Sequence, residues 1–390
     1  MSIIYLDNNA TTKIDPEVLE TLLPYLQEQY GNASSIQHRL GREANAAIEK
    51  ARQQVASSLN VKDKEIFFTS GSTEAINTVI KGVFDNYQRK GKHIITVKTE
   101  HKAVLTVCEQ LEKQGAEITY LSTDASGAID LDELSESIRP DTILVTLMAA
   151  NNETGFIHPI EHIAMRCQEK DTLYFCDATQ YIGKEKIDLA QIPIDILCLS
   201  AHKIHGPKGV GALFIRRKSK PIQIEPLIVG GKQEHGFRGG TYPVHAIAGL
   251  GKAIEIATPS TSINELRDYF EAQIIQRIPE TSIYCKEQLR TANCSNILFK
   301  HVRSSELMVN LPEMAIASGS ACVSGDRNPS HVLKAMGYAD EDAFCSIRFS
   351  LSKWTNKEEL DRALLLLESA CEKIRSQSPI WSMYQSGLLD

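Results

Sequence analysis

The sequence predicts an α/β protein whose large domain is built on a mostly parallel seven-stranded sheet, followed by a smaller α+β domain. Short apolar runs recur between residues 61 and 215, and stretches with helical patterns separate them. These runs show little apolar/polar alternation, which is typical of strands buried on both faces. The runs are EIFFT (65–69), HIITV (93–97), EITYL (117–121), TILVTL (142–147), TLYFC (172–176), DILCLS (195–200) and GALFI (211–215).

The helices are predicted from their start and stop signals. Before the first run, Asp15 and Pro16 mark a helix start and Gly31 marks its end. The alanine-rich residues 43–59 form a second helical pattern. Residues 100–115 carry apolar side chains at helical spacing and end on a glycine, as expected for a helix that connects two parallel strands.

The length of 390 residues favours two domains, and the pattern changes near residue 257. We expect a large domain over 1–257 and a small C-terminal domain over 258–390, with the N-terminal segment as a candidate to pack on the small domain. The small domain is predicted to hold few strands between two longer helices. Its predicted helices are 263–278 and 356–377, and its predicted strands are 296–300, 314–318 and 345–351.

Composition excludes several classes of protein. The net charge is −7 and no dense basic run is present, so we expect no direct nucleic-acid binding. The sequence has no apolar stretch approaching the roughly 18 residues of a membrane span and does not begin like a signal peptide, so we expect a cytoplasmic protein with no membrane partner. The nine cysteines form no C-x-x-C pair, so we expect reduced thiols and no metal site.

Polar residues that follow three of the predicted strands suggest a cofactor site. Ser70–Glu74 would open a helix toward an anion, Asp177 ends one run, and Lys203 follows another. Taken singly, these features also fit a capped helix, a turn aspartate and a solvated loop lysine. Together they supply the amine, the carboxylate and the phosphate site that pyridoxal phosphate requires.

Ten motifs extend this interpretation over nearly the whole chain: YLDNNATT, GNASSIQHRLG, FTSGSTEAIN, TEHKAV, NNETG, CDATQ, SAHKIHGPKGVG, RGGTYPV, SGSAC and IRFSLS. The sequence resembles the cysteine desulfurases of the NifS and IscS type, in the class V aminotransferase group of fold type I pyridoxal phosphate enzymes. It departs from the usual pattern at Ala33 and Thr154, and its C-terminus does not resemble the tail with which some relatives bind an iron–sulfur scaffold.

The resemblance implies roles for residues around the cofactor ring. Lys203 would form a Schiff base with pyridoxal phosphate, and Asp177 would pair with the pyridine nitrogen. His101 would stack on the ring as a catalytic residue, although a structural histidine at a strand end is the alternative. Asn152 and Gln180 would contact the side of the ring that carries the hydroxyl.

The resemblance also implies a phosphate site that is shared between two subunits. Ser72, Thr73, Ser200 and His202 would hold the phosphate. Thr241 would reach it from the second subunit of a homodimer, across the glycine-bounded FRGGTYPV segment.

The substrate would be held by Arg348, whose planar guanidinium suits a carboxylate, with Asn152, Asn32 and His38 framing the pocket. A structural ion pair is the alternative role for Arg348. These assignments, like those for the cofactor, follow from the family motifs.

Cys322 stands apart from the other cysteines because ASGSACVSG surrounds it with small residues, so few apolar neighbours could bury it. A thiolate is a strong nucleophile toward sulfur, and a backbone of low steric demand would let it enter and leave a pocket. The expected reaction is conversion of L-cysteine to L-alanine with a persulfide left on Cys322.

In this reaction Lys203 would act as the general base, and a sulfur acceptor such as an iron–sulfur scaffold protein would take the persulfide sulfur. The alternatives are a selenocysteine lyase, another enzyme of the class V aminotransferase group, or a sulfur-relay scaffold without turnover.

Overall fold

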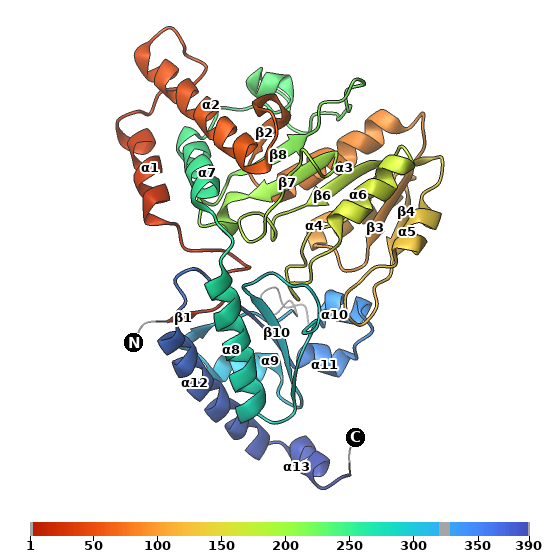
Figure 1. Cartoon of the computed structure of the whole chain (residues 1–390), viewed down its shortest axis with the longest axis vertical. Helices are drawn as coiled ribbons and strands as arrows, with labels where there is room; N and C mark the ends of the chain where they lie inside the picture. The colour runs from red at the N-terminus through yellow and green to blue at the C-terminus, as the bar shows by residue number, and fades with distance from the viewer. Residues whose placement is uncertain (1–2, 320–327, 389–390) are drawn as a thin grey trace.

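The computed structural model describes residues 3–319 and 328–388, and within these ranges it contains sheets of seven, three and two strands (Figure 1). The seven-stranded sheet and its helices form the upper part of Figure 1, and the three-stranded sheet forms the lower part. No helix within the described ranges is long and apolar enough to cross a membrane.

The seven-stranded sheet has the order β2-β8-β7-β6-β5-β3-β4. Strands β3 to β7 pair in parallel with one another, whereas β8 is antiparallel to both β2 and β7. Every residue of β3, β5 and β7 is buried, which explains their uninterrupted apolar runs. The predicted α/β fold with a mostly parallel seven-stranded sheet is confirmed. The strands are β2 (Ile66–Thr69), β3 (His93–Val97), β4 (Glu117–Leu121), β5 (Thr142–Thr146), β6 (Leu173–Asp177), β7 (Ile196–Ser200) and β8 (Gly211–Ile215).

Helices cover both faces of this sheet and bury two apolar clusters against it. One cluster joins the sheet to α3 and α4, and the other joins it to α1, α2, α6 and α7. The helices and short 3₁₀ turns of this part are α1 (Pro16–Gln27), α2 (Arg39–Leu59), η1 (Asp63–Glu65), α3 (Ser72–Tyr87), α4 (Lys102–Glu112), α5 (Leu131–Ser137), α6 (Ile160–Glu169), η2 (Ala201–Lys203), η3 (Gln233–Gly236) and α7 (Val244–Ile256).

Capping residues set the starts of the first two helices. Asp15 accepts a hydrogen bond from the backbone amide of Glu17 at 2.8 Å, and Pro16 occupies the first helical position, as predicted. Helix α2 begins four residues earlier than predicted, because the His38 ring accepts a bond from the backbone amide of Gly41 at 3.1 Å and caps it.

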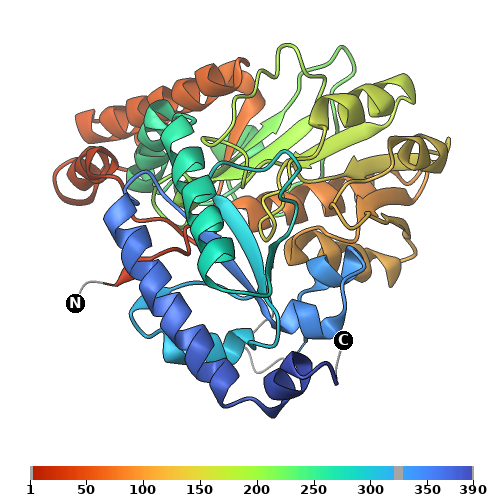
Figure 2. The ribbon, with the colours of Figure 1, turned by 60° about the horizontal axis from the view of Figure 1, so that its bottom comes forward.

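The three-stranded sheet is antiparallel, with the order β12-β10-β9. Figure 2 shows α8 and α12, the teal and blue helices, side by side over this sheet. Phe270 of α8 and Leu364 of α12 pack with Ile297 and Phe349 of the strands in one core. The elements are α8 (Thr261–Arg277), β9 (Thr281–Ile283), β10 (Cys294–Phe299), α9 (Ser304–Asn310), β11 (Met314–Ala315), α10 (His331–Ala335), α11 (Asp340–Phe344), β12 (Ser346–Ser350), α12 (Lys357–Ser376) and α13 (Pro379–Gln385).

The N-terminal segment packs against the C-terminal part of the chain. Strand β1 (Ile4–Tyr5) pairs in parallel with β11, and Ile4 and Leu6 belong to the apolar core of the three-stranded sheet. The expected boundary after residue 257 falls between α7 and α8. The division into domains 1–257 and 258–390 stays a prediction, and the path of residues 4–6 shows that the two parts share structure.

Candidate active site

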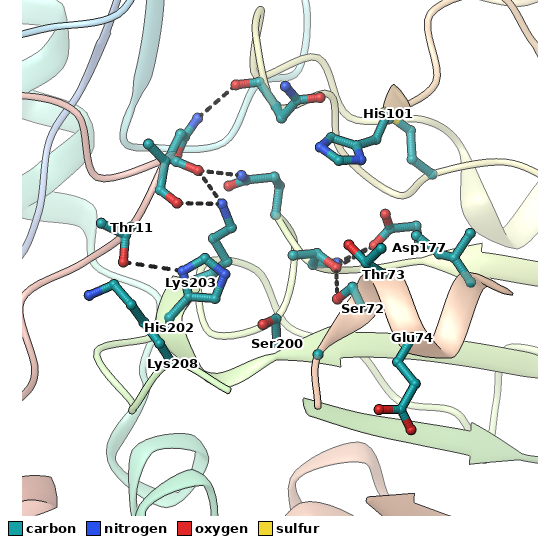
Figure 3. Close-up of a pocket in the computed structure, with 18 of the residues that line it drawn as sticks. Thr11, Ser72, Thr73, Glu74, His101, Asp177, Ser200, His202, Lys203 and Lys208 are labelled. Carbon is teal, nitrogen blue, oxygen red and sulfur yellow. Dashed lines mark hydrogen bonds between the residues drawn. The ribbon is translucent and has the colours of Figure 1, made fainter. Parts of the chain in front are cut away.

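A cavity of about 700 Å³ lies where β6 and β7 end and α3 begins (Figure 3). Its lining residues come from the seven-stranded sheet, the three-stranded sheet and the N-terminal segment. In Figure 3, His101 and Asp177 lie on one side of it, and Lys203, His202 and Lys208 lie on the other. The predicted site residues that line the cavity are Ser72, Thr73, His101, Asn152, Asp177, Gln180, Ser200, His202, Lys203 and Arg348.

The start of α3 forms the anion-binding side of the cavity. Gly71, which precedes the helix, has a φ of 149° that residues with side chains rarely adopt, and it supplies no side-chain cap. The first backbone amides of a helix have no intrahelical acceptor, so they are available to an anion. The hydroxyls of Ser72 and Thr73 line the same region.

The anion-binding side of the cavity also includes Ser200, at the end of β7, and His202 and Lys208, which follow that strand. Burial, with the nearby charges of Lys203 and Lys208, lowers the pKa of His202 to about 4, so its ring is neutral near pH 7. Its Nδ1 lies 3.2 Å from the Thr11 hydroxyl, and Ser200 ends the strand beside Gly71. Lys208 also lines the cavity and adds a positive charge that the sequence analysis did not assign, although it lies in the SAHKIHGPKGVG motif.

Lys203 ends the turn η2 directly after β7. Its ammonium donates to the backbone carbonyl oxygens of Asn9 at 2.6 Å and Ala10 at 2.8 Å. Burial, followed by the positive charge of Arg348, lowers the pKa of this amine to about 8. A larger fraction of Lys203 is therefore neutral and nucleophilic near pH 7 than of an ordinary lysine.

Asp177 is the last residue of β6 and is 7% exposed. One carboxylate oxygen accepts hydrogen bonds from the backbone amide of Thr179 at 2.9 Å and from the Thr179 hydroxyl. The thiol of Cys198, on the neighbouring strand β7, donates to the same oxygen at 3.6 Å. These donors hold the carboxyl group of Asp177 on the wall of the cavity opposite Lys203.

His101 caps α4, and its Nδ1 accepts a bond from the backbone amide of Ala103 at 3.1 Å. The proton of the neutral ring is therefore on Nε2. Burial lowers the pKa of His101, and the charge of Lys203 adds to this effect, so the ring is predominantly neutral at pH 7.

Glu100 supports this turn and was not predicted. Its carboxyl group is buried and accepts bonds from the backbone amides of Met148 at 2.5 Å and His101 at 3.1 Å. Burial raises the pKa of Glu100, and the charge of Asp177 raises it further.

Arg348 reaches the cavity from β12 of the small sheet. Its guanidinium forms an ion pair with Asp7 at 2.7 Å and donates to the backbone carbonyl of Asn152 at 2.9 Å. The structural ion pair considered as the alternative therefore exists, and the same side chain also lines the cavity. Arg348 Nε and Asn152 Oδ1 are buried without a hydrogen-bond partner among the described residues.

The N-terminal segment contributes Asn9, which the sequence analysis did not single out although it lies in the YLDNNATT motif. The Asn9 carbonyl oxygen accepts bonds from both Lys203 and the Gln180 side chain, the latter at 2.9 Å. The Asn9 side-chain oxygen accepts from Lys184 at 2.9 Å. Asn9 thus joins two predicted site residues to a lysine that was not predicted.

Three predicted residues do not line this cavity. Asn32 accepts a bond from the Ser34 amide in an exposed turn, and His38 caps α2. Thr241 is exposed, just before α7. Their assignment to the site stays a prediction. It requires a second copy of the chain, because within one copy these residues do not line the cavity.

Cys322 lies outside the described residues. The eight cysteines within the described ranges are all buried, and burial raises their pKa values, for example to about 11 for Cys285 and Cys345 and to about 12 for Cys371. These eight are therefore poor sources of a thiolate at neutral pH.

The chain is similar to known proteins over nearly its whole length. It matches the aminotransferase class-V family over residues 4–363. It is 44% identical over 392 residues to a cysteine desulfurase IscS of Shewanella oneidensis, in a match that covers 99% of this chain and 96% of that protein. A solved structure of a NifS-like protein has 38% identity and a TM-score of 0.87, covering 95% of this chain and 99% of that chain. A structure of SspA in complex with cysteine has 36% identity and a TM-score of 0.80, covering 90% of this chain and 99% of that chain.

The family match includes both sides of the cavity, since Lys203 at the large sheet and Arg348 on the small sheet lie within residues 4–363. The resemblance inferred from the sequence motifs is confirmed. The chain belongs to the class V aminotransferase family, among the cysteine desulfurases of the NifS and IscS type.

Proposed function

We propose that this protein is a pyridoxal phosphate-dependent cysteine desulfurase that converts L-cysteine to L-alanine and leaves a persulfide on Cys322. The observation that carries the proposal is the meeting of Lys203, Asp177 and the start of α3 in one cavity. An amine with a lowered pKa, a fixed carboxylate and an anion site are the three fixtures that this cofactor needs.

The donor set fits the cofactor. Lys203 would bind it covalently, Asp177 would face its ring nitrogen, and His101 would lie against the ring. Its phosphate would be held by the first amides of α3 together with Ser72, Thr73, Ser200 and His202, with Asn152 and Gln180 on the ring-hydroxyl side. Bound pyridoxal phosphate supplies an electron sink for the charge that develops when the substrate loses its Cα proton.

The substrate carboxylate would bind at Arg348. The guanidinium already meets Asp7 and Asn152 through its terminal nitrogens, and its buried Nε is without a partner among the described residues. A related protein was solved in complex with cysteine, which supports an amino acid of this size as the ligand. The carboxylate would thus orient cysteine between the seven-stranded and the three-stranded sheets.

Lys203 would move the proton at Cα. Because its pKa is lowered to about 8, the amine can take a proton near neutral pH and return it in a later step. Its two contacts with the backbone oxygens of Asn9 and Ala10 hold the side chain at the cavity wall.

Cys322 would carry the sulfur. Its thiolate attacks the substrate Sγ, the bond between Cβ and Sγ breaks, and the sulfur stays on Cys322 as a persulfide while the three-carbon product is protonated to alanine. Two described residues on either side of its segment support the assignment, because each contacts a residue that lines the cavity or adjoins one that does. Ala317 pairs with Arg348 through backbone bonds of 2.7 and 3.3 Å, and His331 Nε2 lies 2.9 Å from the Glu100 carbonyl oxygen.

The wider assignments follow from the same proposal. We expect a cytoplasmic homodimer in which Thr241 of a second copy completes the phosphate site, and an acceptor protein, such as an iron–sulfur scaffold, that takes the sulfur. Heterodimers of a Lys203→Ala chain and a chain lacking the Thr241 loop test the shared site. One of their two sites would be intact, so activity should return, and confirmed heterodimers without activity would count against sharing.

The proposal is tested by comparing wild type with Lys203→Ala. Wild type supplied with pyridoxal phosphate should absorb visible light and release alanine from L-cysteine. Lys203→Ala should lose the covalent cofactor and turnover. A Lys203→Ala protein that produced alanine at the wild-type rate would refute the role of this lysine.

A further inference from the structure

Lys184 is a partly buried lysine that has no role in the proposed reaction. It lies in the segment after β6, four residues beyond Gln180, and lines a second cavity of about 190 Å³ whose wall also includes Lys203. No carboxylate of the described residues lies within salt-bridge distance of its ammonium. A lysine that is removed from water without a counterion costs stability, so its hydrogen bonds call for an explanation.

The ammonium of Lys184 contacts two side chains. It donates to Gln180 Oε1 at 2.6 Å and to Asn9 Oδ1 at 2.9 Å. An ammonium can only donate, so it fixes the Gln180 amide with its oxygen toward Lys184 and its nitrogen away from it. Gln180 Nε2 then donates one proton to the Asn9 carbonyl oxygen at 2.9 Å and keeps a second N–H for the cavity that Gln180 lines.

Asn9 is also held by hydrogen bonds, one of which comes from Lys184. Its side-chain oxygen accepts from Lys184 and from Asn293 Nδ2 at 3.0 Å, while its backbone oxygen accepts from Lys203 at 2.6 Å. Lys184 therefore sets the orientation of Gln180 and the position of the group that binds the Lys203 amine.

The surroundings of Lys184 bring its pKa close to neutral pH. Burial lowers its pKa to about 7, and although Cys294 and Glu185 oppose this effect, the positive charges of Lys203 and Arg348 add to it. Both charge states offer enough N–H groups for the two acceptors, and the ammonium, which has no lone pair, is the form that fixes the Gln180 amide.

We propose that Lys184 is a positioning residue that orients the Gln180 amide and the Asn9 carbonyl toward pyridoxal phosphate and Lys203. This inference rests on the proposed function. It predicts that Lys184 acts on cofactor retention and on turnover, and that it does so mainly through Gln180. Substrate binding should be little affected, since Arg348, which is assigned to the substrate carboxylate, bonds to Asp7 and Asn152, whereas Lys184 bonds to Gln180 and Asn9.

The test measures the dissociation constant of pyridoxal phosphate, from the visible absorbance that the holoenzyme loses on dilution, together with kcat and KM for L-cysteine. Lys184→Met should raise the dissociation constant and lower kcat, each by about tenfold, as expected for about one lost hydrogen bond to a charged group, while KM changes less than twofold. Lys186→Met is the matched control, because Lys186 is exposed two residues further along the chain and should behave like wild type.

A double-mutant cycle separates positioning from a general loss of stability. If Lys184 acts through Gln180, Lys184→Met should have little further effect on cofactor dissociation in a Gln180→Leu background. Lys184→Arg, which keeps the donors, should retain more cofactor than Lys184→Met. If Lys184→Met does not fold, Lys184→Gln, whose shorter side chain cannot reach both partners, replaces it in the cycle.

The outcomes separate this inference from the function on which it rests. Additive effects of the Lys184 and Gln180 substitutions, or a Lys184→Met enzyme that matches the Lys186→Met control, would overturn the positioning role while leaving the cysteine desulfurase assignment intact. A wild-type protein that binds no pyridoxal phosphate would instead refute the proposed function, and this inference with it.

Discussion

The lowered pKa of Lys203 predicts how cofactor loading depends on pH. Only the neutral amine attacks the aldehyde of pyridoxal phosphate. With a pKa of about 8 in place of 10.5, the neutral fraction at pH 7 rises from about 0.03% to about 9%, an increase of about 300-fold. The loading rate of the cofactor-free protein should therefore rise about tenfold per pH unit below pH 8 and level off above it.

The assay follows visible absorbance after pyridoxal phosphate is mixed with cofactor-free protein between pH 6 and 10. Nα-acetyllysine, measured in parallel, should show a rate that keeps rising toward pH 10. Burial is the largest cause of the shift and the charge of Arg348 is the second, so Arg348→Met should move the bend upward. A wild-type loading rate that climbs through pH 9 without a bend would refute this account of Lys203.

Three further predictions test other parts of the structure. Arg348→Lys should raise KM for L-cysteine about tenfold or more while cofactor absorbance is retained, because lysine lacks the planar fork, and an unchanged KM would contradict the carboxylate role. Arg52→Met should lower the free energy of unfolding by about 3–5 kcal/mol in urea titrations, because it leaves the Glu234 carboxylate buried without its two bonds of 2.9 Å. The double variant Arg52→Met with Glu234→Gln should recover part of that loss, because it removes the buried charge. A wild-type urea midpoint for Arg52→Met alone would contradict a stabilising role for the Arg52–Glu234 ion pair. Cys322→Ser should bind cofactor and still change its absorbance with L-cysteine yet produce no sulfide, so sulfide release at the wild-type rate would move the nucleophile elsewhere.

The large sheet could be predicted from the sequence because its strands are buried on both faces. All seven apolar runs correspond to strands, with ends shifted by at most one residue. β9 was missed because it is short and only partly buried, so its residues carry no continuous apolar pattern. β1 was missed for a different reason: two residues pair with a strand about 310 positions away, and no local pattern reports such a contact.

The cavity was predictable where residues follow strand ends, as for Asp177, Ser200 and Lys203, because parallel strands bring their carboxyl ends to one edge. Asn9 and Lys184 could not be found in this way. Their roles depend on hydrogen bonds between the N-terminal segment and the turn after β6, which are far apart in the chain. His38 has a local use as a helix cap that the motif alone did not reveal.

The most direct test of the central claim is the mass of the Cys322 peptide after the protein has been incubated with L-cysteine and pyridoxal phosphate and digested without reductant. The proposed function predicts one added sulfur atom on Cys322 in wild type, with one alanine formed per sulfur. It predicts neither the added sulfur nor alanine in Lys203→Ala. Added sulfur on one of the buried cysteines such as Cys108 or Cys345, with Cys322 unmodified and alanine still produced, would contradict the proposed mechanism.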